Sequence, residues 1–198
     1  MQLLAVKKPQ NPAYIRNQTD NTLVSTTWTG SKKMKTIFWG MFGNISDNGC
    51  GVIAAFNALV SKNPSTDFIK VRDGLANYGG VLLGIGSIGV DPVNLTFYMK
   101  SKFNDANLNF DILGINLLSK KNTENTKKAD AIIVLVKWKD TAEMHYFTGI
   151  RNKGTDGFNF YNSDIMDVTD NNPITMEQLS EKIKDMGAKP LGLITIND

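Results

Sequence analysis

The chain of 198 residues contains only one cysteine, Cys50, and one histidine, His145. A single cysteine excludes an intrachain disulfide and leaves the redox compartment open. One cysteine and one histidine cannot form a zinc site of the usual kind without several carboxylates, so we predict no metal and no cofactor.

The chain also lacks a large excess of charge of either sign and lacks long apolar runs. The 22 Lys and Arg residues exceed the 19 Asp and Glu residues by 3, and the basic pairs do not alternate with aromatic residues, so no nucleic-acid partner is predicted. No apolar run approaches the length of a membrane span. The N-terminus lacks the basic and then apolar order of a signal peptide. A cytoplasmic protein and a secreted one whose signal peptide has been removed are both compatible with these features, and nothing indicates the oligomeric state.

The composition is typical of a globular protein, with 41% hydrophobic and 21% charged residues. At this length we expect one domain, with or without an extension. The first residues are polar and include Pro9 and Pro12, which favours an extended arm. We therefore predict an N-terminal arm or extension over residues 1–38 and one domain over residues 39–198.

Apolar residues at helical spacing predict three helices in the first half of the chain. The first runs from about Cys50 to Lys62. The second begins after Ser65 or Thr66, either of which could cap it, and the third begins at Asp91-Pro92. The glycine-rich stretch before Asp91 lacks the Lys-Ser or Lys-Thr of a phosphate loop, so a connecting loop is predicted there.

The second half of the chain has the pattern of strands. They are predicted at Leu108–Ile112, Ala131–Trp138, His145–Ile150, Phe158–Asn162 and Leu191–Ile196. Residues 114–129 are expected to form a turn and a polar loop. Thr175 and Gln178 form a capping box that begins a helix ending near Met186. The order of elements predicts an α+β fold, with N-terminal helices packed on a C-terminal antiparallel sheet.

Three residues in this arrangement suggest thiol chemistry. Cys50 is at the start of a helix, where free N–H groups and the helix dipole favour the reactive thiolate. His145 begins one strand, and Asn162 ends the next, so a short hairpin makes them neighbours. An amide at Asn162 could fix the orientation of the imidazole. A cysteine, a histidine and an orienting third group form the thiol version of the acyl-transfer triad.

Nearby residues offer further candidates for the same site. Asn44, with the backbone N–H of Cys50, could form an oxyanion hole, and Asn48 is a second candidate for that role. Asp164 is an alternative orienting residue, because its side chain points the same way as that of Asn162 two positions earlier.

The order of these motifs resembles the papain-like cysteine peptidases, and most closely the bacterial branch that processes bacteriocin leaders. The likeness covers residues 40 to 165, including Cys50-Gly51, the Gly-Val-Asp-Pro start of the third helix, and the strand containing His145. It implies that Cys50 is the nucleophile, His145 the general base and acid, and Asn162 the orienting residue. The family usually has Gln at the oxyanion position, where this chain has Asn44.

The resemblance implies a cysteine peptidase-like hydrolase that attacks a peptide or amide bond of a peptide or protein substrate through a Cys thioester. Two alternatives remain open. The chain could be a non-catalytic module that binds peptides or proteins on the same fold. It could also use the same triad for deamidation or transglutaminase-type transfer, in which only the acceptor differs.

Overall fold

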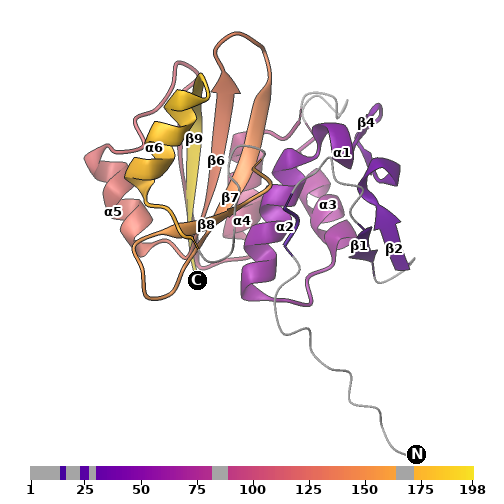
Figure 1. Ribbon diagram of the computed structural model, residues 1–198. Helices are drawn as coiled ribbons and strands as arrows, with labels where there is room; N and C mark the ends of the chain where they lie inside the picture. Colours follow the sequence, from indigo (N-terminus) through magenta and orange to yellow (C-terminus); the bar gives the residue numbers. More distant parts are fainter. Residues whose placement is uncertain (1–13, 17–22, 27–29, 82–88, 164–171) are drawn as a thin grey trace, which may run out of the picture.

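The computed structural model describes residues 14–16, 23–26, 30–81, 89–163 and 172–198. Within these residues the chain forms a mixed α+β structure with helices on both faces of one antiparallel sheet (Figure 1). No helix among the described residues is long and apolar enough to cross a membrane.

The sheet has five strands in the order β5-β9-β6-β7-β8, and every neighbouring pair is antiparallel. The strands are β5 (Asp105–Phe110), β6 (Ala131–Trp138), β7 (Met144–Arg151), β8 (Phe158–Tyr161) and β9 (Ala188–Asn197). The predicted meander of β6, β7 and β8 is confirmed. Strand β9 lies between β5 and β6, and it is paired on both sides.

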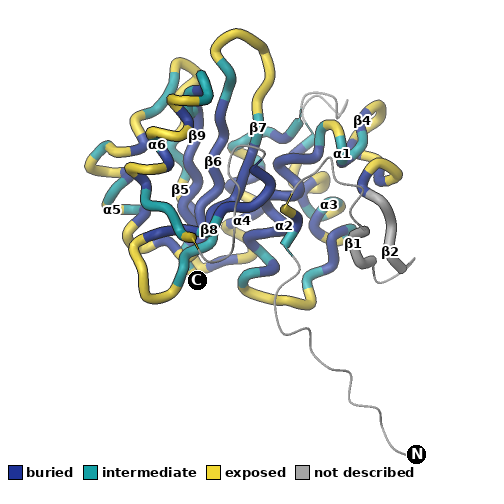
Figure 2. Tube along the Cα trace, in the orientation of Figure 1, coloured by how far each residue is buried: buried dark blue, intermediate teal, exposed yellow. Residues whose placement is uncertain are grey.

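Helices α2 (Cys50–Lys62), α3 (Phe68–Asn77) and α4 (Pro92–Lys100) share one core with the sheet. Ala131, Ile133 and Leu135 of β6 face this side. The alternate residues Ile132, Val134 and Val136 face the second core, which they share with α6 (Met176–Asp185). Figure 2 shows β6 and most of α2 as buried. Successive residues of β6 from Ala131 to Val136 therefore alternate between the two cores.

Short elements precede α2. They are β1 (Leu23–Thr26), β2 (Gly30–Lys33), a 3-10 turn (Met34–Thr36), β3 (Phe38–Trp39), β4 (Gly43–Asn44) and α1 (Ile45–Asn48). The division at residue 38 stays a prediction. Of the residues before it, Ile15, Met34 and Ile37 are buried in the same core as α2.

Several predicted boundaries are confirmed. Helix α2 has the predicted bounds, Asp91 caps α4 with Pro92 in its first turn, and Thr175 and Gln178 form the capping box of α6. The predicted caps Ser65 and Thr66 are wrong, because Asp67 accepts from the N–H of Lys70 and caps α3.

Two predictions in the region between β5 and β6 are wrong. Ile112 lies outside β5 and is 71% exposed. Residues 114–129 contain helix α5 (Lys120–Lys128) rather than only a loop. The buried residues of α5 are polar: Asn122 donates to the carbonyl of Asn116 and accepts from the amide of Asn109. A helix that buries amide and hydroxyl groups has no apolar periodicity to reveal it.

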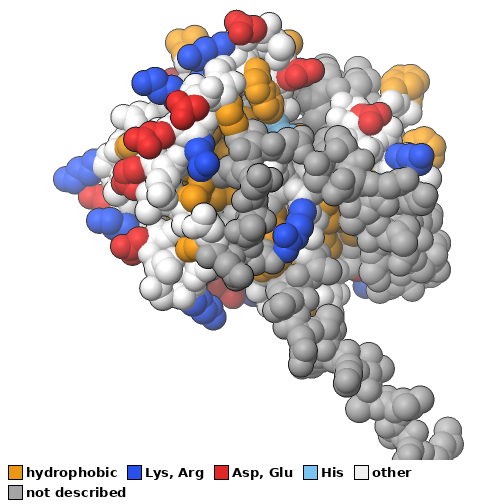
Figure 3. Space-filling model, in the orientation of Figure 1, with side chains coloured by type: hydrophobic (Ala, Val, Ile, Leu, Met, Phe, Trp, Pro, Cys, Tyr) orange, Lys and Arg blue, Asp and Glu red, His pale blue; other side chains and the backbone are white. Residues whose placement is uncertain are grey.

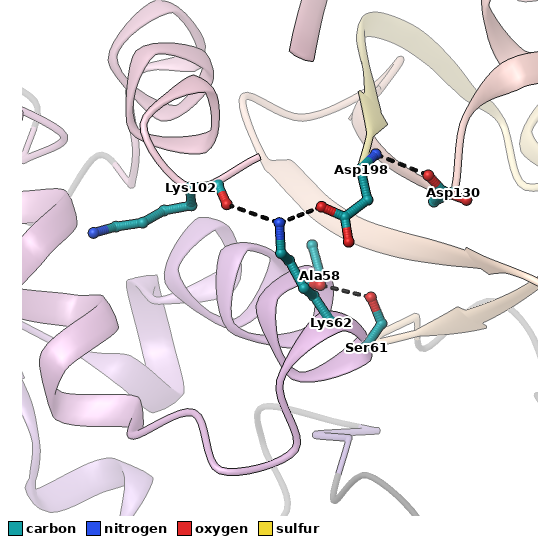
Figure 4. A network of polar contacts seen from close by, with 6 residues as sticks. All are labelled: Ala58, Ser61, Lys62, Lys102, Asp130 and Asp198. Atoms are coloured by element: carbon teal, nitrogen blue, oxygen red, sulfur yellow. Dashed lines mark hydrogen bonds and ion pairs between the residues drawn. The ribbon is translucent and has the colours of Figure 1, made fainter. Parts of the chain in front are cut away.

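The C-terminal end of α2 is tied to β9 by a surface network (Figure 4). The Lys62 ammonium pairs with the Asp198 carboxylate and lies 3.5 Å from the carbonyl oxygen of Lys102, which follows α4. The backbone N–H of Asp198 donates to Asp130 at 2.9 Å. Because both members of the ion pair are partly exposed, the pair contributes at most about 1 kcal/mol, and its main effect is to fix where the two segments meet.

A buried amide in α2 holds the segment 14–16 against the fold. Asn57 is fully buried; its Oδ1 accepts from the N–H of Ile15 and its Nδ2 donates to the Ile15 carbonyl, both at 2.9 Å. We expect Asn57→Ala to lower the free energy of unfolding by about 2–3 kcal/mol, because both Ile15 groups then stay buried without these bonds. Urea denaturation measures the loss.

The matched control for this change is Asn94→Ala. The Asn94 amide also donates to a backbone carbonyl, that of Gly79, but this hydrogen bond is exposed. Water replaces it at little cost, so we expect a loss below about 1 kcal/mol. Equal losses for the two variants would contradict a special role of the buried amide.

Candidate functional site

Cys50 is the first residue of α2 and lies between two glycines. A Cβ at Gly49 would come within 2.6 Å of the Ile45 carbonyl oxygen, and one at Gly51 within 2.6 Å of the Val90 side chain. Larger residues at either position would therefore displace the neighbouring backbone or side chain. The glycines let the start of α2 pack closely against α1 and against the segment that leads to α4.

The Cys50 thiol is buried, with 7% of the residue exposed, and it contacts the backbone of Tyr146 in strand β7. Burial is the largest influence on the thiol and raises its pKa; hydrogen bonds from backbone N–H groups, first that of Tyr146 and then those of Gly51 and Cys50, lower it by less. The N–H groups at the start of the helix lower the pKa of the thiol, as expected, but the pKa as a whole is raised. The donors are present, but the loss of water outweighs them.

The raised pKa has a measurable consequence. Above about pH 8.5 an unfolded chain releases a thiol proton that the folded chain retains, so this group makes the free energy of unfolding fall as pH rises. Below that pH both states keep the proton and the contribution is constant. We expect iodoacetamide to alkylate Cys50 more slowly in the native protein at pH 7 than in urea. Fast native alkylation that persists below pH 7 would contradict a neutral resting thiol.

Strand β8 ends close to this point. Its last pair with β7 is Tyr161 with Thr148, and the next residue, Asn162, has a left-handed backbone with φ of 58°. The chain therefore leaves β7 before it reaches Tyr146. The Asn162 side-chain amide donates from Nδ2 to the Tyr146 carbonyl at 3.2 Å. The Asn162 side chain thus forms a hydrogen bond with a backbone carbonyl of β7 beyond the point where pairing with β8 stops.

His145 and Asn162 are neighbours, as predicted, but the contact involves the backbone carbonyl of Asn162 and not its side-chain amide. The imidazole Nε2 lies 2.5 Å from the backbone carbonyl oxygen of Asn162. The ring of Trp138 lies beside the imidazole, with 6.4 Å between ring centroids. The contacts therefore link the sulfur of Cys50 to Tyr146, Tyr146 to Asn162, and Asn162 to His145.

Tyr146 is the residue of this site that the sequence did not indicate. Its N–H and carbonyl contact Cys50 and Asn162, and its hydroxyl donates to the carbonyl of Val90 at 3.0 Å. Burial raises the pKa of the Tyr146 phenol well above its ordinary value, and negative charge on Cys50 or Asp91 would raise it further. The phenol is therefore a neutral donor at physiological pH. Tyr146 is the first of four consecutive buried residues in β7, and a core residue gives no sign of a role in a site.

Asn44 lies at the start of α1, six residues before Cys50. Its Oδ1 accepts from the N–H of Asp47 at 3.0 Å, and its Nδ2 donates to the Asp47 carboxylate at 2.7 Å. In this conformation Asn44 is the cap of α1, and its role at an oxyanion hole stays a prediction. Asn48 is the last residue of α1. Asp164 lies outside the described residues.

The surroundings give little sign of other ligands. Among the described residues, no group of three or more His, Cys, Asp or Glu side chains is arranged to hold a metal ion. Figure 3 shows acidic and basic side chains intermixed over the described part of one face. A cavity of about 550 Å³ lies between α5, β8 and the start of α6, with Lys127, Arg151 and Glu177 in its lining, and none of the candidate site residues lines it.

A comparison with models of known protein families and with curated proteins found no match to this chain. The function must therefore be inferred from the residues and their contacts.

Proposed function

We propose that the protein is a thiol hydrolase of papain-like type that cleaves a peptide or amide bond through a Cys50 thioester. The observation that carries the proposal is the chain of contacts from Cys50 through the backbone of Tyr146 to Asn162 and His145. The Cys50 thiol, at the start of α2, lies beside strand β7, which carries the His145 imidazole. Asn162 contacts that imidazole. These are the parts that nucleophilic acyl transfer requires.

The proposed reaction has two steps. The Cys50 sulfur attacks the substrate carbonyl carbon while His145 takes the thiol proton. The C–N bond then breaks, His145 gives the proton to the leaving amine, and a thioester remains on Cys50. Water, deprotonated by His145, attacks the thioester carbonyl carbon and forms a tetrahedral intermediate. The C–S bond then breaks, His145 returns the proton to the sulfur, and the carboxylic acid leaves.

The raised pKa of Cys50 determines how the first step begins. The resting state on this proposal is a neutral thiol, and its proton moves to His145 only as the sulfur attacks. The donors around the sulfur, including the N–H of Tyr146, then stabilise charge that the buried thiol does not carry at rest. The backbone N–H of Cys50 and the amide of Asn44, if Asp47 releases it, are the proposed donors to the oxyanion.

The experiment is a product analysis with a library of short peptides of varied sequence. After incubation with the protein, mass spectrometry would detect cleaved fragments if the reaction is hydrolysis. Deamidation of a Gln or Asn side chain would instead leave the peptide intact and add about one dalton, and transfer would join two peptides. Fragments would support hydrolysis, and intact peptides with a mass change would support the deamidase or transglutaminase-type alternative.

The burial and raised pKa of Cys50 also favour a second candidate, a non-catalytic module that binds a peptide or protein on the same fold. A buried neutral thiol is typical of a packed cysteine as well as of a resting enzyme. If no peptide is changed and Cys50 is never acylated, but some peptides are retained on the immobilised protein, this second function replaces the first.

A further inference from the structure

We propose that Asn162 orients His145 through its backbone carbonyl, held in place by its left-handed backbone, and so fixes the imidazole proton on Nε2. Asn162 would then be a positioning residue whose main-chain conformation matters, in contrast to the side-chain role expected from the sequence. The catalytic meaning of this inference rests on the proposed function, but the position of the proton can be measured independently of any activity.

The proton assignment follows from the chemistry of the contact. A carbonyl oxygen can only accept a hydrogen bond, so at 2.5 Å the Nε2 atom of His145 must be the donor. In a neutral imidazole the other nitrogen, Nδ1, then carries no proton and is the acceptor of the ring. The contact with Asn162 therefore makes Nδ1 the atom that can take a proton from a thiol.

The direction of this carbonyl depends on an uncommon backbone conformation. Asn162 is the one residue other than glycine with positive φ among the described residues, at 58°. Asn and Gly tolerate this region, whereas most L-residues are strained in it. A residue that prefers an extended backbone would turn the carbonyl oxygen away from the imidazole.

The side-chain amide has a different task. Its Nδ2 donates to the Tyr146 carbonyl, which ties the turn to β7 where β8 has ended. The Asn162 side chain is almost completely buried, with 1% of the residue exposed, so this bond is shielded from water. The amide thus supports the turn, and the carbonyl of the same residue contacts the histidine.

The test begins with the wild-type protein. Because His145 is the only histidine, nitrogen NMR of protein labelled with ¹⁵N-histidine reports one imidazole without assignment. At a pH where the ring is neutral, we expect the Nε2–H tautomer to dominate. A dominant Nδ1–H tautomer in the wild type would overturn the proposal without any variant.

The second part compares Asn162→Gly with Asn162→Ala. Both remove the side-chain amide, but only glycine adopts the left-handed backbone without strain. We expect the glycine variant to keep the Nε2–H tautomer as the major form and the alanine variant to lose at least about half of it. Equal tautomer populations in the two variants, whether both high or both low, would overturn the role of the backbone.

Asn159 in β8 supplies the matched control, because it is an asparagine of the same strand where no left-handed backbone is needed. Asn159→Gly and Asn159→Ala should leave the tautomer as in the wild type. If the order of glycine and alanine at position 162 is as expected but peptides are not changed, the positioning inference stands and the proposed function fails. If peptides are cleaved but the glycine and alanine variants do not differ in this way, the proposed function stands and the positioning inference fails.

Discussion

Replacing Cys50 by Ala should lower the rate of peptide cleavage by at least about 1,000-fold, because no other group of the site can form the thioester. His145→Ala should cause a loss of similar size, because the buried thiol is neutral at rest and needs a base. The double variant should lose little more than either single variant, since the two residues act as one unit. The rates are measured by mass spectrometry on any peptide that the wild-type protein cleaves.

Met144→Ala is the matched control for these variants. Met144 precedes His145 in β7 and is 45% exposed. Its loss should change the rate by only a few-fold, with an unchanged thermal midpoint. If the Cys50 variant kept the wild-type rate, the proposed nucleophile would be wrong, whatever the outcome for His145.

The largest expected effect on stability is that of Phe147→Ala. Phe147 is fully buried in the core on the α6 side of the sheet, and its ring meets that of Phe160 edge-on with 5.6 Å between centroids. Removing it leaves a cavity between the sheet and α6. We expect a loss of about 3–5 kcal/mol in the free energy of unfolding, which is a large part of the stability of a typical domain.

The control for this change is Phe97→Ala in α4, where the side chain is 55% exposed. We expect that variant to lose less than about 1 kcal/mol, since little apolar surface is removed from the core. Both values come from urea titrations monitored by circular dichroism. Similar losses at the two positions would contradict the layered packing described above.

Elements with strong local signals were predictable from the sequence. Helix α2 has apolar residues at helical spacing and begins beside a glycine, so its bounds could be read directly. The start of α4 and the capping box of α6 depend on short-range hydrogen bonds of Asp91, Thr175 and Gln178, which are local in the chain as well. The strands β6, β7 and β8 follow from apolar runs separated by tight turns.

Features that depend on distant or polar contacts were not predictable. The two hydrogen bonds between Asn57 and Ile15 join positions 42 residues apart, and neither residue type indicates such a contact in the sequence. At the candidate site, the spacing of His145 and Asn162 indicates that they meet but not which atoms do so. The contact through the Asn162 carbonyl depends on one backbone angle, and the pKa of Cys50 depends on how completely water is excluded around it.

The place of β9 in the sheet has a consequence for how the chain can fold during synthesis. Residues 188–197 pair with β5 on one side and β6 on the other, so these two strands are not joined until that stretch has emerged from the ribosome. Until then the growing chain carries the β6–β7–β8 meander with one edge of its most apolar strand open. Such an edge is a template for pairing with other chains. The order of the strands along the chain thus leaves this edge of β6 open to other chains until β9 enters the gap.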